Sequence, residues 1–274
     1  MTDLVVRRLM IDLEAPFARH WCGDDAFRSA FFNALSMSFP VGEQFFIDAV
    51  RDAAQTLPEA EQAAWKAEIQ GFVGQEATHR HLHALFNRHL EQQGLVNRWA
   101  PRVLKRMKRL QGLDVRHPLA ITVANEHFTA ILADWLLAHP QAVASSDERL
   151  STLWMWHSAE ESEHKATAFD LYAALGGSHE WRVRWFRRVT VFFLGDLLRQ
   201  ILRNLWHDGS LWQWRTWRSA ASFLFGKQGL VHAMYKPWRE FLRADFHPSD
   251  LESSASQRWF SDHQDRFRAV ARAA

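Results

Sequence analysis

Two Glu-x-x-His pairs stand out among the residues that could do chemistry. Glu76 precedes His79 in QEATHRH, and Glu161 precedes His164 in EESEHK. A spacing of three places both side chains of a pair on one face of a helix, about one turn apart. Each pair therefore has the geometry to bind a metal ion through a carboxylate and an imidazole.

A lone glutamate precedes each pair inside an apolar stretch with helical spacing. Glu43 in VGEQFF lies 33 residues before Glu76, and Glu126 in ANEHFTA lies 35 residues before Glu161. Because the chain has 15 histidines, two Glu-x-x-His pairs alone are within chance, and the matched upstream glutamates carry the inference. Intervals of this length suit two antiparallel helices joined by a short loop. The pattern predicts a two-metal site between four helices.

The ligand types indicate which ions would bind. Carboxylate oxygen and imidazole nitrogen suit iron, manganese or zinc rather than calcium. Carboxylates buried in an apolar bundle would repel one another strongly unless cations neutralised them. We expect two metal ions, iron first, with manganese or zinc as alternatives. The expected ligands are Glu43, Glu76, His79, Glu126, Glu161 and His164.

Two further histidines lie one helical turn from the pairs. His83 follows His79 by four residues, and His157 precedes Glu161 by four, so both could face the site. They would then be additional ligands, hydrogen-bond partners of the ligands, or proton carriers. The alternative is that they are histidines at the edge of the core, bonded to backbone carbonyls.

The other reactive side chains carry weaker signals. Glu160 and Glu163 flank the ligand face, and we expect them to be solvated. We expect Tyr172 to be a packing residue, and Cys22 has no basic neighbour that would make it a nucleophile. No nucleophile elbow, phosphate loop or dinucleotide fingerprint occurs in the sequence. Any reductant would therefore come from outside the chain.

Four helical stretches must position the ligands. The hydrophobic spacing predicts helices at about 24–54, 56–90, 118–139 and 145–176. The last should begin with a capping box of Ser145 and Glu148. The basic stretch 91–116 suits a long crossover that contains a short helix. No stretch shows the alternation that predicts a sheet.

Proline and glycine within these helices need an explanation. Pro40 should kink the first helix or open a turn just before Glu43. Gly71 and Gly74 each cost about 1 kcal/mol in a helix interior relative to alanine. They would either permit close helix packing or clear space beside the metal site.

The four ligand motifs resemble those of a known group. GEQFF, QEATHRH, NEHFTA and WHSAEESEHKATAFD are similar to the ligand helices of the ferritin-like di-iron carboxylate superfamily. More closely, they resemble the bacterial family of predicted metal-dependent hydrolases, over roughly residues 5–245. The resemblance implies an all-α, ferritin-like four-helix bundle with the same six ligands. Members of the superfamily use such sites for oxygen activation, ferrous oxidation or electron transfer.

The composition constrains the partners and the location. The 274 residues carry a net charge of +2, which argues against a nucleic-acid partner. The N-terminus lacks the apolar core of a signal peptide. The most apolar long stretch, 189–206, contains Asp196, Arg199 and Arg203, so it should not span a membrane. We expect a cytoplasmic protein, either free or peripheral to the inner membrane.

The last third of the chain differs in character from the rest. Eight of the 14 tryptophans lie beyond residue 180. We therefore divide the chain into a four-helix bundle with its lead-in (1–178) and a Trp/Arg-rich helical extension (179–274). The extension could cover the bundle, form a lipid-facing or acyl-binding surface, or make a subunit contact in a homodimer. Its first helix should have an apolar stripe of Val191, Leu194, Leu198, Ile201 and Leu205.

Three functions are compatible with these features. The leading hypothesis is a di-iron oxidoreductase that activates dioxygen against a hydrophobic, lipid-like substrate, with an external electron donor. The apolar lining of its site would come from Phe39, Phe46, Phe72 and Phe86. The alternative is a metal-dependent hydrolase in which a bridging hydroxide attacks an ester or amide. The third is a non-catalytic iron-handling or scaffold protein.

Overall fold

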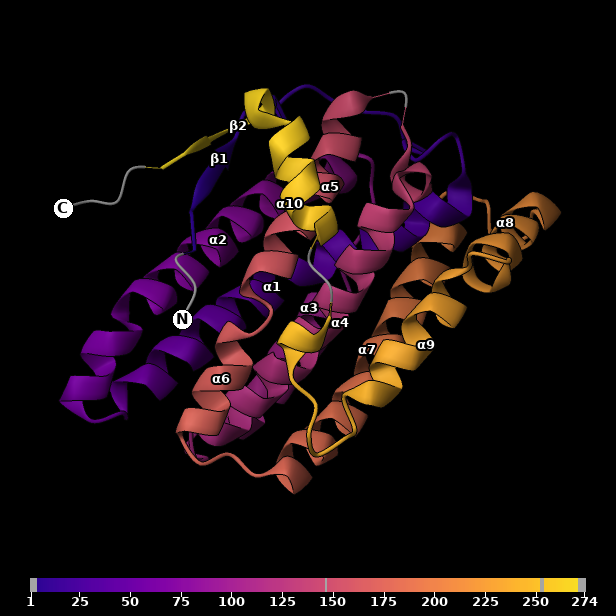
Figure 1. The fold of residues 1–274 in the computed structure, drawn as a ribbon. Helices are drawn as coiled ribbons and strands as arrows, with labels where there is room; N and C mark the ends of the chain where they lie inside the picture. The colour runs from indigo at the N-terminus through magenta and orange to yellow at the C-terminus, as the bar shows by residue number, and fades with distance from the viewer. Residues whose placement is uncertain (1–3, 146, 252–253, 271–274) are drawn as a thin grey trace.

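The computed structural model describes residues 4–145, 147–251 and 254–270, and it is mostly helical (Figure 1). The α-helices are α1 (Ala26–Gln55), α2 (Glu59–Gln92), α3 (Trp99–Met107), α4 (Arg116–Ala138), α5 (Glu148–His164), α6 (Thr167–Ala174), α7 (His179–His207), α8 (Trp214–Phe225), α9 (Leu230–Glu240) and α10 (Ser254–Asp262). Short 3₁₀ helices are η1 (Lys108–Leu110), η2 (Pro140–Val143), η3 (Pro248–Asp250) and η4 (Gln264–Arg266). The expected all-α class is confirmed.

Four helical columns surround the expected ligands: α1, α2, α4 and the consecutive pair α5 and α6. Helices α1 and α2 form a hairpin, and α4 packs against α5 and α6 (Figure 1). The crossover between the two halves contains α3 and η1, as the basic stretch 91–116 predicted. The first three expected ligand helices match α1, α2 and α4 to within a few residues.

The fourth ligand helix differs from its prediction. It is interrupted at Lys165 and Ala166, so that α5 ends at His164 and α6 begins at Thr167. At the break, the buried ammonium of Lys165 donates to the Leu251 carbonyl at 2.7 Å. The predicted capping box is wrong as well. Asp147 caps α5, because the Ser145 hydroxyl donates instead to the backbone carbonyl of Trp21.

We expected a kink or a turn at Pro40; helix α1 continues through this residue, which excludes the turn. Proline lacks the N–H that would bond to the Ser36 carbonyl one turn earlier. The side-chain amide of Asn87 on α2 donates to that carbonyl at 2.8 Å and replaces the missing bond. A side chain from the neighbouring helix therefore lets α1 run on to present Glu43.

A small sheet, which the sequence did not predict, joins the two ends of the chain. Strands β1 (Arg7–Leu9) and β2 (Phe267–Ala269) pair antiparallel. Three-residue strands are too short to show an alternating pattern. The segment before β1 crosses α2 at its two interior glycines: a Cβ at Gly71 would lie 2.5 Å from Leu4 Cβ, and one at Gly74 would lie 2.3 Å from Val6 Cγ2. These glycines therefore permit close packing against the N-terminal segment rather than against another helix.

Helix α7 packs against α1 and α4, and its buried face is only partly the expected one. Ile201 and Leu205 are buried, whereas Val191, Leu194 and Leu198 are exposed. The buried side at this level carries Asp196, which pairs with two arginines of the crossover helix α3. The predicted stripe is displaced in this half, because Phe186, Val189 and Leu197 form the apolar side of α7 that packs into the core.

The proposed division at residue 178 stays a prediction. One cluster of buried apolar residues contains Phe32 from α1, Leu205 from α7 and Trp259 from α10, so the two segments share a core. Among the described residues, no helix combines the length and the apolarity needed to cross a membrane.

Candidate metal centre

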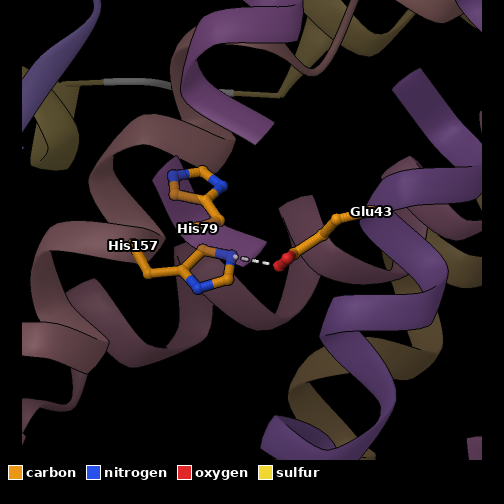
Figure 2. Close-up of side chains that lie close together, drawn as sticks. All are labelled: Glu43, His79 and His157. Carbon is orange, nitrogen blue, oxygen red and sulfur yellow. Dashed lines mark ion pairs between the residues drawn. The ribbon is translucent and has the colours of Figure 1, made fainter. Parts of the chain in front are cut away.

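The six expected ligands lie together in the interior of the bundle, each at most 4% exposed. With His157 they form two groups in which one potential ligand atom per residue lies within 4.8 Å of all the others in its group. The first group is Glu43, His79 and His157 (Figure 2), and the second is Glu76, Glu126, Glu161 and His164. The sequence named the six residues, but this division and the place of His157 come from the structure.

The first group brings α1, α2 and α5 together (Figure 2). The imidazoles of His79 and His157 stack with ring centroids 4.1 Å apart. His157 Nε2 lies 4.0 Å from Glu43 Oε1 and 2.8 Å from Glu161 Oε1. Three helices thus aim one carboxylate and two imidazoles at a common point.

The second group surrounds His164. Its Nε2 atom lies 3.1 Å from Glu76 Oε1, 3.4 Å from Glu126 Oε2 and 3.5 Å from Glu161 Oε2. The other oxygen of Glu161 lies 3.5 Å from Nδ1 of His79 in the first group. Glu161 therefore stands between the two groups, in the position that a shared carboxylate would occupy.

Three of the four carboxylates in the centre make no hydrogen bond to the described residues, whereas Glu161 is bonded to His157. In the part of the chain that the structure describes, both oxygens of Glu43, Glu76 and Glu126 are buried without a hydrogen bond. Buried polar groups in proteins are nearly always bonded, and unpaired buried charge is costly. Metal cations would satisfy these oxygens, and a set of oxygen and imidazole donors suits iron, manganese or zinc. The residues present thus fit a pair of metal ions.

Burial and mutual repulsion shift the titration of these carboxyls. Burial, followed by the charge of Glu76, raises the pKa values of Glu43 and Glu126 well above their ordinary value. Burial would also raise the pKa of Glu161, but the charge of His164 holds it well below the usual range. Without metal, the centre therefore retains protons that a bound cation would displace.

In two histidines, the outer ring nitrogen, which points away from the carboxylates of the centre, donates a hydrogen bond. His79 Nε2 lies 3.0 Å from Glu160 Oε2, an acceptor. His164 Nδ1 lies 2.9 Å from Gln75 Oε1, and the amide nitrogen of Gln75 is occupied by the Val5 carbonyl and by Glu163. Because Gln75 Oε1 can only accept, His164 Nδ1 must donate. The inner nitrogens, His79 Nδ1 and His164 Nε2, are left to face the centre.

The tautomer of His157 follows from a chain of hydrogen bonds. Since the Asn87 amide donates to the Ser36 carbonyl, Asn87 Oδ1 must accept the Ser36 hydroxyl proton at 2.8 Å. His83 Nδ1 then donates to Ser36 Oγ at 2.9 Å, and His157 Nδ1 donates to His83 Nε2 at 2.7 Å. His157 Nε2 keeps its lone pair toward Glu161, so a proton or a metal ion must lie between them.

The pKa values of these two histidines agree with neutral rings. Burial and the charge of His157 lower the pKa of His83 well below its ordinary value. Burial and the charge of His79 lower the pKa of His157 to about 4. The expectation that both histidines face the site is met differently by each: His157 points into the centre, and His83 supports it from behind.

Arg7 of β1 binds two glutamates that lie behind the ligands, and no motif in the sequence indicates this contact. Its guanidinium donates to Glu160 at 3.2 Å and to both oxygens of Glu163 at 2.6 and 2.8 Å. The expectation that these glutamates are solvated is wrong for Glu160, which is fully buried, and Glu163 is only partly exposed. Both are needed as acceptors behind His79 and Gln75.

The aromatic residues expected at the site are divided between two roles. Phe39 contacts the rings of His83 and His157, with centroids 4.6 and 4.9 Å apart, and Phe72 lies 5.1 Å from the ring of His164. Phe46 and Phe86 are buried in the two apolar clusters on either side.

Two other side chains have structural contacts. Tyr172 of α6 donates its hydroxyl proton to the carbonyl of Ser178, the residue that caps the start of α7. Burial raises the pKa of the Cys22 thiol to about 12.

The fold and the site together define an all-α protein with a buried centre of carboxylates and histidines. The model of one family, described as predicted metal-dependent hydrolase, matches residues 5–252, and the chain belongs to this family. Neither a curated protein nor a solved structure matches the chain.

Proposed function

We propose that this protein is a hydrolase with two metal ions in a ferritin-like four-helix bundle. Family membership supports the hydrolytic activity. The observation that carries the metal centre is the orientation of three histidines, His79, His157 and His164. Each has its outer nitrogen occupied and its inner nitrogen turned toward the buried carboxylates of the centre.

The ligands divide according to the two groups. Glu43, His79 and His157 would hold one ion. Glu76, Glu126 and His164 would hold the other, with Glu161 shared between them. Iron, manganese and zinc all suit these donors. Bound ions of this kind lower the pKa of a water molecule enough to make it a nucleophile near neutral pH.

The surrounding residues favour an apolar ester or amide as the substrate. A hollow of about 20 Å³ adjoins His157 and Glu161, and Phe39, Leu132 and Leu136 line it. A space of this size holds about one water molecule. An organic substrate would therefore enter by displacing these apolar side chains. Once it was bound, the same side chains would exclude bulk water from the bond that reacts.

The test compares metals under anaerobic conditions. Protein loaded with zinc or manganese should hydrolyse apolar p-nitrophenyl esters, and Glu76→Ala should abolish turnover while the circular dichroism spectrum stays helical. His89→Gln is the matched control, since this buried histidine bonds to the Leu13 carbonyl outside the centre. Fully metal-loaded protein that turns over no ester or amide would contradict the hydrolase proposal.

A second candidate is a di-iron oxidoreductase that activates dioxygen. The small size of the hollow favours it, because a diatomic gas fits such a site more easily than an organic ester does. In that case, reduced iron-loaded protein would consume oxygen beyond the amount needed to oxidise its iron when a lipid-like substrate is added. Anaerobic turnover with zinc would then be absent, so the two activities are distinguished by one pair of assays.

A further inference from the structure

A second concave site lies between α1, η2, α8 and the turn that connects α8 to α9. It is an open cavity of about 840 Å³, and no residue of the two metal groups lines it. It is also lined by Trp135, near the end of α4, and by His139, which directly follows that helix. Trp135 follows Glu126 by nine residues, or about 13 Å along the helix axis.

Positive charge dominates the lining of this basic cavity. Its charged residues are Arg28, Arg215, Arg218 and Lys227 against the single acid Asp25, with His139 as a titratable neighbour. Asp25 is already used, because it accepts the Arg28 N–H at the start of α1 and the hydroxyl proton of Ser219. Within the described residues, Arg215, Arg218 and Lys227 make no ion pair. Three positive charges therefore remain without a counterion.

Parts of this lining are fixed in place. Arg28 Nη1 donates to the Gln141 carbonyl at 3.1 Å, which orients the guanidinium at the cavity edge. Trp135 Nε1 donates to the Gln228 carbonyl at 3.2 Å and so attaches the α8–α9 turn to α4. His139 Nδ1 bonds to the Trp135 carbonyl, which leaves Nε2 as its other polar atom. Hydrogen bonds thus hold the side chains of Arg28, Trp135 and His139 in place along the cavity.

The size and chemistry of the cavity specify a class of ligand. Its volume falls within the range of small-molecule sites and exceeds what a lone inorganic anion would fill. Arginine forks bind phosphate through paired hydrogen bonds. Phe223 and Trp135 supply an apolar wall for an organic part. We propose that the basic cavity binds a phosphorylated small molecule of about nucleotide size.

Isothermal titration calorimetry on the full chain tests this assignment. The probes are ATP, pyrophosphate and citrate at one fixed ionic strength. We expect ATP to bind more tightly than citrate. The double variant Arg215→Gln/Arg218→Gln should weaken ATP binding at least tenfold, because it removes two of the positive charges that would pair with phosphate. Both arginines are exposed, so the variant should fold.

The control removes the same charge elsewhere. Arg51→Gln/Lys66→Gln lies on exposed positions of α1 and α2 and should leave ATP binding within twofold. Absence of binding by ATP and pyrophosphate, or equal losses in both double variants, would overturn the proposal. If citrate bound more tightly than ATP, the cavity would recognise carboxylates rather than phosphates, and the proposal would be wrong. Selective binding of RNA or anionic vesicles through the same arginines would refute the small-molecule assignment.

Discussion

Three histidines of the candidate metal centre are oriented by residues outside the ligand pattern. Glu160 holds His79, Gln75 holds His164, and His83 holds His157. Such outer partners fix the tautomer and ring orientation of metal-binding histidines, and their loss typically lowers metal affinity about 10–100-fold. At this scale, function depends on the acceptor behind each ring as much as on the ligand itself.

The role of His157 can be separated from that of the six expected ligands. We expect His157→Gln to lose one of the two bound ions, or to bind it about 10–100-fold more weakly, because the first group keeps only Glu43 and His79. Metal analysis and chelator competition measure this. The control His89→Gln should retain both ions. Full metal content in both variants would show that His157 only supports its neighbours.

Arg7 neutralises the two glutamates, Glu160 and Glu163, that lie behind the ligands. Arg7→Gln removes the arginine from the fully buried Glu160 and leaves it, among the described residues, only His79 as a charged partner; breaking a buried pair in this way costs about 3–5 kcal/mol of unfolding free energy. Urea unfolding should show this loss, together with weaker metal binding. Arg8→Gln on the exposed side of the same strand should change neither. A loss below about 1 kcal/mol for Arg7→Gln would mean that the pair is effectively solvated.

At the scale of elements, a proline in α1 is linked to a histidine in the centre. Pro40 frees the Ser36 carbonyl, Asn87 binds it, and this fixes the direction of the hydrogen bonds through His83. A proline on α1 therefore influences which ring nitrogen of His157 on α5 faces the metal centre.

This linkage predicts non-additive mutations. Asn87→Ala should cost about 1–3 kcal/mol, because it leaves the Ser36 carbonyl buried without a donor. In the Pro40→Ala background the helix regains an N–H for that carbonyl, so the same mutation should cost measurably less. A double-mutant cycle by chemical denaturation gives the coupling energy. Additive costs would mean that water or another donor already serves Ser36.

The elements were predictable where the local pattern was long. Helices α1, α2 and α4 carry their own apolar periodicity and their ligands, so their bounds could be inferred from the sequence. The break between α5 and α6 could not, since Lys165 finds its acceptor at Leu251, 86 residues away. No local signal places the buried Asp196 of α7 beside the arginines of α3.

The site was predictable as a set of ligands but not as an assembly. Matched intervals identified Glu43 and Glu126 beside the two pairs. The link between Arg7 and Glu160 spans 153 positions, and only the folded chain brings them together. Hydrogen-bond partners behind a metal ligand have no fixed spacing from it, so a sequence motif does not contain them.

Across the whole molecule, the two chain ends form the outer wall of the centre. Strand β2 pairs with β1, and the rings of Phe260 and Phe267 lie 3.9 and 5.6 Å from the Arg7 guanidinium carbon. This aromatic cover limits water around Arg7 and strengthens its pairing with Glu160 and Glu163. Residues beyond the family match, which ends at 252, thus contribute to the environment of the ligands.

Proton balance links the centre to the stability of the entire chain. Burial opposes protonation of His79 and His164, but hydrogen bonds from His79 to Glu160 and Glu161 raise its pKa to about 10, and the charge of Glu161 raises that of His164. Their folded pKa values exceed those of the unfolded chain. The stability they contribute without metal is therefore fully present below about pH 6.5 and is lost as the pH rises toward 10.

Metal binding must displace these protons, so the loaded protein should show the opposite trend. The apparent metal affinity should increase from pH 6 to pH 8, while the metal-free protein becomes less stable over the same interval. Titration calorimetry at pH 7 in buffers of different ionisation enthalpy should detect release of at least two protons per chain, one each from His79 and His164. Binding without proton release would mean that both inner nitrogens are already free, and the metal-free and loaded stability curves would then run parallel with pH.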